Sequence, residues 1–228
     1  MEDNRDNKNV ISKPNVLTPT IENVRQALTG PLPGVVGQTK MAPEPSASQI
    51  NRWDKADGYR EAGVLLLLYP QITNNGALTE LHLVLTRRTE YPGVHSGQIS
   101  FPGGRREPEE SLQRTALRET MEEVGVLPEE LEIIGQLSSL YTSASNFCIH
   151  PFVAFSATRP TFRLDPKEVA ELIEAPLSLL LNPTNRKEEI WRFQDSEQRR
   201  IPFFSVFGYQ VWGATAMILS EFLTLLGN

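Results

Sequence analysis

Apolar runs separated by turn residues recur through the middle of the chain. Residues 62–70 (AGVLLLLYP) form a continuous apolar run of the length of a buried strand, and residues 81–88 (LHLVLTRR) predict a second strand. Between them, residues 74–76 (NNG) predict a turn. Residues 97–101, 131–140 and 148–157 also predict extended segments. The pattern therefore predicts several short strands within about a hundred residues.

Helical patterns flank these strands. Residues 18–30 predict a short helix that is capped by Thr20 and ended by Gly30. Residues 166–173 begin an element of mixed pattern, and residues 187–194 and 201–207 predict a hairpin or meander. Residues 212–227 predict a closing amphipathic helix. Strands interspersed with two principal helices favour a mixed α/β sandwich.

The N-terminal quarter differs in composition from the rest. Residues 1–15 are polar, charged and without periodicity, which predicts a disordered tail. Residues 31–60 are rich in Pro, Gly and Ser and predict a surface loop or linker. We therefore expect a tail at 1–15, a helix and linker at 16–60, and a single main domain at 61–228.

Composition and charge restrict the function. With 39% hydrophobic and 22% charged residues the 228-residue chain has an ordinary globular composition, and its net charge of −6 gives no overall attraction to nucleic acid or to an anionic membrane. The longest apolar run, residues 64–69, is too short to span a bilayer, and the N-terminus lacks the apolar core of a secretory signal. The single cysteine, Cys148, is expected to be buried and suits a reducing cytoplasm. We expect a cytoplasmic monomer or homodimer.

A helix ending at Gly125 carries an unusual acidic cluster. Its start is signalled by either Pro108 or Ser111, and we expect it at Pro108, because Ser111 has no capping-box partner three residues later. At 100° per residue, Glu123 falls inside the edge of an apolar stripe formed by Leu112, Ala116, Leu117, Thr120 and Val124. A carboxylate at that border must be paired or bound to metal.

A divalent cation explains the cluster best. Like charges three and four residues apart on a helix cost about 0.2–0.5 kcal/mol per pair, and Arg118 can pair with Glu122 but not with every neighbouring carboxylate. Gly103 and Gly104 precede the helix, where they let backbone approach a ligand and offer carbonyl oxygens. Because all these donors are oxygens, Mg²⁺ or Mn²⁺ is favoured over zinc.

Residues 104–126 (GRREPEESLQRTALRETMEEVGV) resemble the Nudix box, GX5EX7REUXEEXGU. Thr120 stands where an aliphatic residue is usual, and the fixed positions are Gly104, Glu110, Arg118, Glu119, Glu122, Glu123 and Gly125. The resemblance implies an α/β/α sandwich around a central mixed β-sheet. It also implies metal-dependent hydrolysis of nucleoside diphosphates linked to another moiety, which are small-molecule nucleotide substrates.

Residues 85–104 resemble the upstream motif of the coenzyme A pyrophosphatase branch, at Leu85, Thr86, Arg88, His95, Gly97, Gln98, Phe101 and Pro102. Pro92 and Gly93 depart from it, standing where Leu and Arg are usual. Residues 168–183 and 211–223 look similar to the same branch. This resemblance implies cleavage of coenzyme A or its acyl derivatives into 3′,5′-ADP and 4′-phosphopantetheine. A Nudix enzyme acting on ADP-ribose, NADH or another nucleoside diphosphate derivative, and a non-catalytic nucleotide-binding module, stay open as alternatives.

The resemblance also implies residue roles. Arg118 orients a carboxylate, Glu122 holds a second metal or activates water, and Glu168 is a candidate base from outside the box. The expected metal ligands or supports are Gly103, Glu110, Glu119, Glu122 and Glu123. The expected substrate-binding residues are Arg88, Arg105 and Arg106, which offer partners for phosphates, with His95 and Gln98, which contact substrate or brace the loop.

Overall fold

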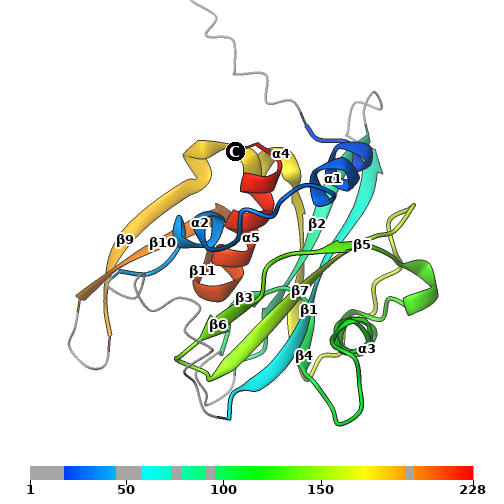
Figure 1. The fold of residues 1–228 in the computed structure, drawn as a ribbon, viewed down its shortest axis with the longest axis horizontal. Coiled ribbons are helices and arrows are strands. Elements are labelled where there is room, and N and C mark those ends of the chain that lie inside the picture. The colour runs from blue at the N-terminus through cyan, green and yellow to red at the C-terminus, as the bar shows by residue number, and fades with distance from the viewer. Residues whose placement is uncertain (1–17, 45–57, 73–78, 91–95, 194–197, 228) are drawn as a thin grey trace, which may run out of the picture.

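A mixed eight-stranded sheet forms the centre of the protein (Figure 1). The computed structural model describes residues 18–44, 58–72, 79–90, 96–193 and 198–227. The main path of the sheet runs β3–β2–β1–β7–β5, while β4 pairs with β1, β6 with β7 and β8 with β2. The strands are β1 (Arg60–Ile72), β2 (Thr79–Arg88), β3 (Ile99–Ser100), β4 (Gly103–Arg105), β5 (Glu132–Gln136), β6 (Leu140–Thr142), β7 (Phe147–Phe155) and β8 (Val169–Pro176).

Strand β1 is buried on both faces, which explains its continuous apolar run. It is antiparallel to β2 and β4 and parallel to β7. Leu65 and Leu67 belong to a hydrophobic cluster with Ala116 and Val124. Leu66 and Leu68 belong to a second cluster on the opposite face of the sheet. The strands predicted at 62–70 and 81–88 are thereby confirmed.

Helices cover both faces of this sheet and form an α/β/α sandwich. Figure 1 shows α3 (Leu112–Val124, green) on one side and α5 (Gly213–Leu225, red) on the other. Three shorter helices join the α5 side: α1 (Ile21–Leu28), α2 (Gly34–Thr39) and α4 (Leu177–Leu181). Single 3₁₀ turns lie at Pro128–Glu130 and Pro183–Asn185. The expected fold class is therefore confirmed.

A second, three-stranded antiparallel sheet lies beside α5. Its order is β11–β10–β9, with β9 (Arg186–Arg192), β10 (Gln198–Val206) and β11 (Tyr209–Trp212). The predicted hairpin or meander at 187–194 and 201–207 corresponds to β9 and β10. Phe204 and Val211 join the main core cluster with residues of α5, so this sheet closes the α5 side of the molecule.

The start of α3 differs from expectation. Its first helical residue is Leu112, and the Ser111 hydroxyl caps it by accepting a hydrogen bond from the Arg114 amide at 3.3 Å. Pro108 therefore does not begin the helix. Glu109 has a φ of +63°, in the left-handed region, so the chain turns at this residue before the helix can start. The expected end is confirmed, because Gly125 adopts φ +74° and donates to the Met121 carbonyl.

Three other segments depart from expectation because contacts with distant parts of the chain decide their structure. Helix α2 lies inside the stretch predicted as a surface loop, where its Gly37 and Gln38 are buried. The extended segment predicted at 131–140 is shorter in the structure, where β5 ends at Gln136 and β6 begins only at Leu140. Helix α5 is not amphipathic, since Ala216 to Leu223 are all buried. Packing on several sides, by α2, β10 and β11, removes the polar face that a surface helix has.

Some expectations fall outside the described residues. These are the tail at 1–15, the turn at 74–76 and the substrate-binding role of His95. Thr20 caps α1 as predicted, and the helix ends at Leu28 with Thr29 as its C-cap, so the predicted stop, Gly30, follows directly after the cap. Cys148 is 4% exposed and is buried as expected.

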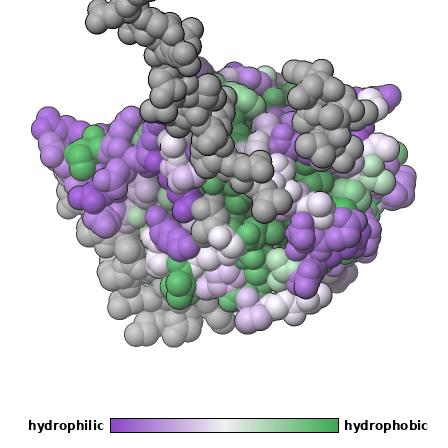
Figure 2. Space-filling model, turned by 90° about the horizontal axis from the view of Figure 1, so that it is seen from above, coloured by the Kyte–Doolittle hydropathy of each residue, from purple (hydrophilic) through white to green (hydrophobic). Residues whose placement is uncertain are grey.

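The surface of the described residues carries both apolar and polar areas. None of the helices in the described ranges is long and apolar enough to cross a membrane. Figure 2 shows a face on which apolar residues form a band between polar areas. Val35 and Val36 are adjacent in α2, while the other exposed large apolar residues lie apart from one another along the chain, and such single exposed residues are ordinary on a folded domain. They are Val35, Val36, Met121, Leu127, Ile190 and Phe207.

Candidate functional site

Helix α3 presses its acidic edge against the two glycines of β4. Gly104 pairs with Gly63 in β1, and the space a side chain would need at Gly104 is filled by the carboxylate of Glu119. Gly103 has a φ of +150°, and its amide donates to Glu123 Oε2 at 3.3 Å. Glycine suits both positions for different reasons: a Cβ at Gly104 would meet the Glu119 carboxylate, and a Cβ at Gly103 would meet the Gly63 carbonyl oxygen and Val64 of β1.

Arg118 joins three of the carboxylates. Its Nε lies 3.0 Å from Glu110 Oε1, and its NH1 lies 2.9 Å from both Glu119 Oε1 and Glu122 Oε2. The hydrogen bonds from Arg118 lower the pKa of Glu110 to about 2, with a further contribution from the Thr115 hydroxyl. Glu110 and Glu119 in turn raise the pKa of Arg118. The predicted Arg118–Glu122 pair is thus present, and Arg118 also holds Glu110 and Glu119 in place.

Glu123 is the most buried acidic residue of the cluster. It is 2% exposed, as its position inside the apolar stripe predicted. Burial raises its pKa to about 8, although Arg88 and the Gly103 amide act in the opposite direction. Arg88 NH1 lies 3.8 Å from Glu123 Oε1. One distant arginine and one amide therefore do not fully compensate a carboxylate that has left water.

Glu119 shares this environment. Burial raises its pKa against the opposing effect of Arg118, and the negative charges of Glu122 and Glu168 raise it further. Glu168 thus lies near the cluster although it is not on α3. The loop before it is tied to the end of α3, because the Asp165 amide donates to the Glu123 carbonyl at 3.0 Å. Tertiary structure therefore brings the candidate base toward the acidic residues of the helix.

The donors suit a hard divalent cation. Four carboxylates share the guanidinium groups of Arg118 and Arg88, so negative charge is left over. Within the described ranges no group of three or more His, Cys, Asp or Glu side chains is already arranged as a metal site. The carboxylate oxygens of Glu110, Glu119 and Glu123 instead accept hydrogen bonds from hydroxyl, arginine and amide donors. The buried, incompletely compensated Glu123 and the all-oxygen donor set nevertheless fit Mg²⁺ or Mn²⁺.

The candidate substrate-binding residues differ in their exposure and in the partners that they contact. Arg88 reaches the carboxylate side of the sheet while Arg87 pairs with Glu171 on β8, because successive side chains of a strand point to opposite faces. Arg88 Nε is buried and has no hydrogen-bond partner among the described residues. Arg105 is exposed. The backbone carbonyl of Gln98 accepts a hydrogen bond from the Arg88 amide at 3.0 Å.

Arg106 is engaged with protein groups. Its NH1 lies 2.6 Å from Glu61 Oε2, and its Nε donates to the Glu110 carbonyl at 2.6 Å. Sequence reasoning missed Glu61, because an acidic residue at the start of a strand carries no distinguishing signal. It also missed Thr115, whose hydroxyl donates to Glu110 Oε2 at 2.8 Å.

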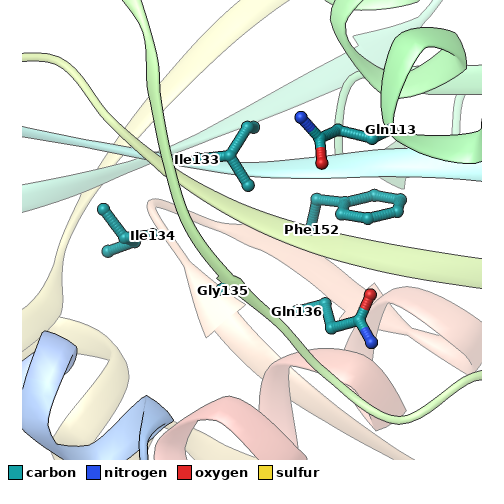
Figure 3. Close-up of a pocket in the computed structure, with 6 residues that line it drawn as sticks. All are labelled: Gln113, Ile133, Ile134, Gly135, Gln136 and Phe152. Carbon is teal, nitrogen blue, oxygen red and sulfur yellow. The ribbon is translucent and has the colours of Figure 1, made fainter.

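A shallow groove of about 340 Å³ lies beside the first half of α3. Figure 3 shows Gln113 from α3 and Phe152 from β7 close to Ile133, with Ile134 on the other side of the strand. Its lining residues are Gln113, Ile133, Ile134, Gly135, Gln136 and Phe152. None of the acidic residues lines it, so it is separate from the carboxylate cluster.

Comparison with known proteins agrees with the motif. The family model described as the NUDIX domain matches residues 71–193. The Nudix hydrolase NudL of Photorhabdus laumondii is 32% identical over 173 residues, which cover 73% of this chain and 84% of that protein. A probable Nudix hydrolase of Schizosaccharomyces pombe is 36% identical over 165 residues, which cover 72% of this chain and 55% of that protein. Nudix hydrolase 3 of Caenorhabditis elegans is 30% identical over 179 residues, which cover 70% of this chain and 72% of that protein.

Solved structures give a weaker likeness. The MutT protein from Methanosarcina mazei is 20% identical, with 73% of this chain and 93% of that chain covered and a TM-score of 0.44. At a TM-score below 0.5 this likeness is too slight to support an inference about substrate or mechanism.

Proposed function

Because the chain belongs to the Nudix hydrolases, enzymes that act on nucleoside diphosphate derivatives, we propose that it hydrolyses the diphosphate bond of coenzyme A or of its acyl derivatives. The products would be 3′,5′-ADP and 4′-phosphopantetheine. The substrate proposal rests on residues 85–104, which resemble the upstream motif of the coenzyme A pyrophosphatase branch.

The observation that supports the proposal most is the pairing of Arg88 with Glu123. Arg88 belongs to the upstream segment and Glu123 to the helix, and the two side chains meet at 3.8 Å. A buried guanidinium nitrogen without a partner in the described structure is suited to a phosphate oxygen, which arginine recognises well. A diphosphate held there would lie against the acidic edge of α3.

Nudix hydrolases need divalent metal ions, and we assign Mg²⁺ or Mn²⁺ to the carboxylate cluster. The ligands would come from Glu119, Glu123 and the Gly103 carbonyl, with Glu122 available for a second ion and Glu110 in support. Bound there, the ion would neutralise phosphate charge and lower the pKa of a coordinated water.

The protein residues divide the remaining work. Arg118 fixes the orientations of Glu110, Glu119 and Glu122 through hydrogen bonds of 2.9–3.0 Å. Glu122, which is half exposed, and Glu168, in the loop beside the cluster, are the candidates to take the proton from the attacking water. Water adds to one phosphorus as the bridging P–O bond breaks, and Arg88 and Arg105 offset the charge on the phosphates.

A second substrate class competes. Gly93 stands where the coenzyme A branch usually has an arginine, which would be a natural phosphate partner. A Nudix enzyme that acts on ADP-ribose or NADH needs no reader for a 3′-phosphate. The site described above would serve either reaction, because both cleave a diphosphate.

A substrate panel separates these proposals. Coenzyme A, an acyl-coenzyme A, ADP-ribose and NADH are incubated with the full chain and either Mg²⁺ or Mn²⁺, and products are resolved by chromatography. We expect 3′,5′-ADP from the coenzyme A substrates. Glu119→Gln/Glu123→Gln serves as the inactive control. Much faster turnover of ADP-ribose or NADH under the same conditions would overturn the coenzyme A assignment and leave the family assignment intact.

A further inference from the structure

We propose that Glu61 and Arg106 are positioning residues, which hold the turn that presents Glu110 to Arg118. The proposal rests on the function proposed above for the reaction that it serves. Glu61 precedes residue 71, where the family match begins, and Arg106 occupies a variable position of the Nudix box. Neither contact is therefore specified by the motif itself.

One guanidinium links the central sheet to this turn. Arg106 NH1 pairs with Glu61 Oε2 at 2.6 Å, while its Nε donates to the Glu110 carbonyl at 2.6 Å. The Arg106 amide also donates to the Glu61 carbonyl at 2.9 Å. Glu61 stands beside Arg106 because β1 pairs with β4 in a register that sets Ala62 opposite Arg105. The sheet thus fixes the position from which Arg106 reaches the turn.

The turn needs such support because its backbone is strained. Glu109 adopts a φ of +63°, in the left-handed region that is unfavourable for a non-glycine residue. The Glu110 amide donates to the Glu107 carbonyl, and the Glu107 amide donates to Glu110 Oε2, both at 3.3 Å. Strained conformations persist where the surroundings hold them, and the shorter bond from Arg106 supplies a hold from outside the turn.

The turn matters because Glu110 positions Arg118. Glu110 accepts from Arg118 Nε at 3.0 Å, and Arg118 in turn holds Glu119 and Glu122 at 2.9 Å. A shift of Glu110 therefore moves the guanidinium that orients two expected metal ligands. Small displacements of catalytic groups are costly, since about 1 Å can reduce the rate a hundredfold.

Glu61 is itself held against β7, because its backbone pairs with Cys148 of that strand. His150 of β7 lies near it, with Nε2 3.7 Å from Glu61 Oε1, which is beyond hydrogen-bond distance, and with Nδ1 2.9 Å from the Ser139 hydroxyl. Nε and Nη1 of Arg106 are thus both bonded to protein groups, the Glu110 carbonyl and the Glu61 carboxylate. This arrangement favours a positioning role for Arg106 over the phosphate contact that its place in the sequence suggested.

The test compares Glu61→Gln, Arg106→Gln, the double variant, Arg106→Lys and Glu132→Gln. Glu132 is the control, because it forms an ion pair of the same length, 2.6 Å, with Arg25 away from the acidic cluster. On the substrate that the panel identifies, we expect each of the two Gln variants to lower kcat roughly tenfold with KM little changed. The double variant should be no slower than either single one. Arg106→Lys should recover part of the rate, and Glu132→Gln should keep full activity.

A substrate-free readout separates this proposal from the proposed function. NMR exchange of the Arg118 Nε proton, assigned by its loss in Arg118→Lys, should be faster in Glu61→Gln and unchanged in Glu132→Gln. A raised KM in Arg106→Gln with normal kinetics in Glu61→Gln would show phosphate binding and overturn the positioning role. Unchanged Arg118 exchange in Glu61→Gln would overturn it as well, whatever substrate the enzyme uses.

Discussion

Arg88 and Glu123 lie 3.8 Å apart, at the point where the end of β2 meets the buried edge of α3. The pair connects the segment that resembles a substrate-recognition motif with the helix that carries the acidic residues. Glu123 nevertheless keeps a pKa raised to about 8, because its burial outweighs the attraction of Arg88. A cation beside Glu123 and an anion beside Arg88 would therefore each meet a charged group that its partner compensates only in part.

The metal-free protein should lose stability as the pH rises from about 4.5 to 8. The folded state holds a proton on Glu123 up to about pH 8, whereas the unfolded chain releases it near 4.5. The stabilisation is therefore complete below 4.5 and is lost as the pH rises through 8, at about 1.4 kcal/mol per unit of pKa difference. Thermal unfolding in EDTA across this range measures the change.

The Glu123→Gln variant provides the comparison, since glutamine stays neutral like the protonated acid. Its melting temperature should exceed that of the parent at pH 8 and match it near pH 5. Glu122→Gln, at a half-exposed position, is the control and should follow the parent curve. Equal pH profiles for Glu123→Gln and the parent would show that Glu123 is ionised in the folded state throughout.

Divalent metal should stabilise the fold through the acidic cluster. Binding to the folded state alone raises its stability by mass action, about 2.7 kcal/mol at a hundred times the Kd. Adding Mg²⁺ or Mn²⁺ should therefore raise the melting temperature of the parent, and Glu119→Gln/Glu123→Gln should lose most of this response. If the double variant responds as strongly as the parent, the ion binds elsewhere.

Gly104→Ala should impair the site with a local effect. The added methyl group would occupy the space that the Glu119 carboxylate fills, so Glu119 must move away from Arg118 and β4. We expect a large loss of turnover and of the metal-induced shift in melting temperature. Gly30→Ala is the matched control, because its Cβ would approach only the Ala27 carbonyl oxygen at 3.4 Å. Full activity in Gly104→Ala would show that the close approach is not needed.

Glu109→Gly should be neutral or stabilising, unlike most substitutions by glycine. Glycine adopts positive φ without steric cost, which offsets the entropy it adds to the unfolded chain. In contrast, Gln113→Gly, at an exposed position inside α3, should cost about 1 kcal/mol. Urea unfolding of both variants checks the difference. Equal destabilisation of the two would contradict the strained turn at Glu109.

The enzyme should prefer coenzyme A over dephospho-coenzyme A if an arginine reads the 3′-phosphate. Losing a hydrogen bond to a charged group costs roughly 1.5–3 kcal/mol, or about tenfold to a hundredfold in kcat/KM. Initial rates on the two substrates with the same metal give the ratio. If the arginine missing at Gly93 is the usual reader, the ratio should be small and Gly93→Arg should increase it. A ratio near one in both proteins would remove the 3′-phosphate from the recognition.

Local patterns predicted much of the fold and the identity of the acidic site. The apolar run of β1, the glycine that ends α3 and the burial of Glu123 all follow from periodicity or capping, which depend on residues close together in the chain. The start of α3 was ambiguous at this level, because Pro108 and Ser111 are both acceptable signals. The left-handed turn at Glu109 and the hydrogen bond from the Arg114 amide to the Ser111 hydroxyl decide for Ser111.

Tertiary structure alone decided which groups meet across the sheet. The sequence determined that an acidic helix edge follows two glycines, but not that the Glu119 carboxylate fills the space beside Gly104. It determined that only one of Arg87 and Arg88 faces the helix, while the sheet placed Arg88 there. It offered Arg106 as a phosphate partner, whereas the register of β1 and β4 set Glu61 beside it. Spacing along the chain fixes a periodic face, but strand register and packing between distant segments decide which charges become partners.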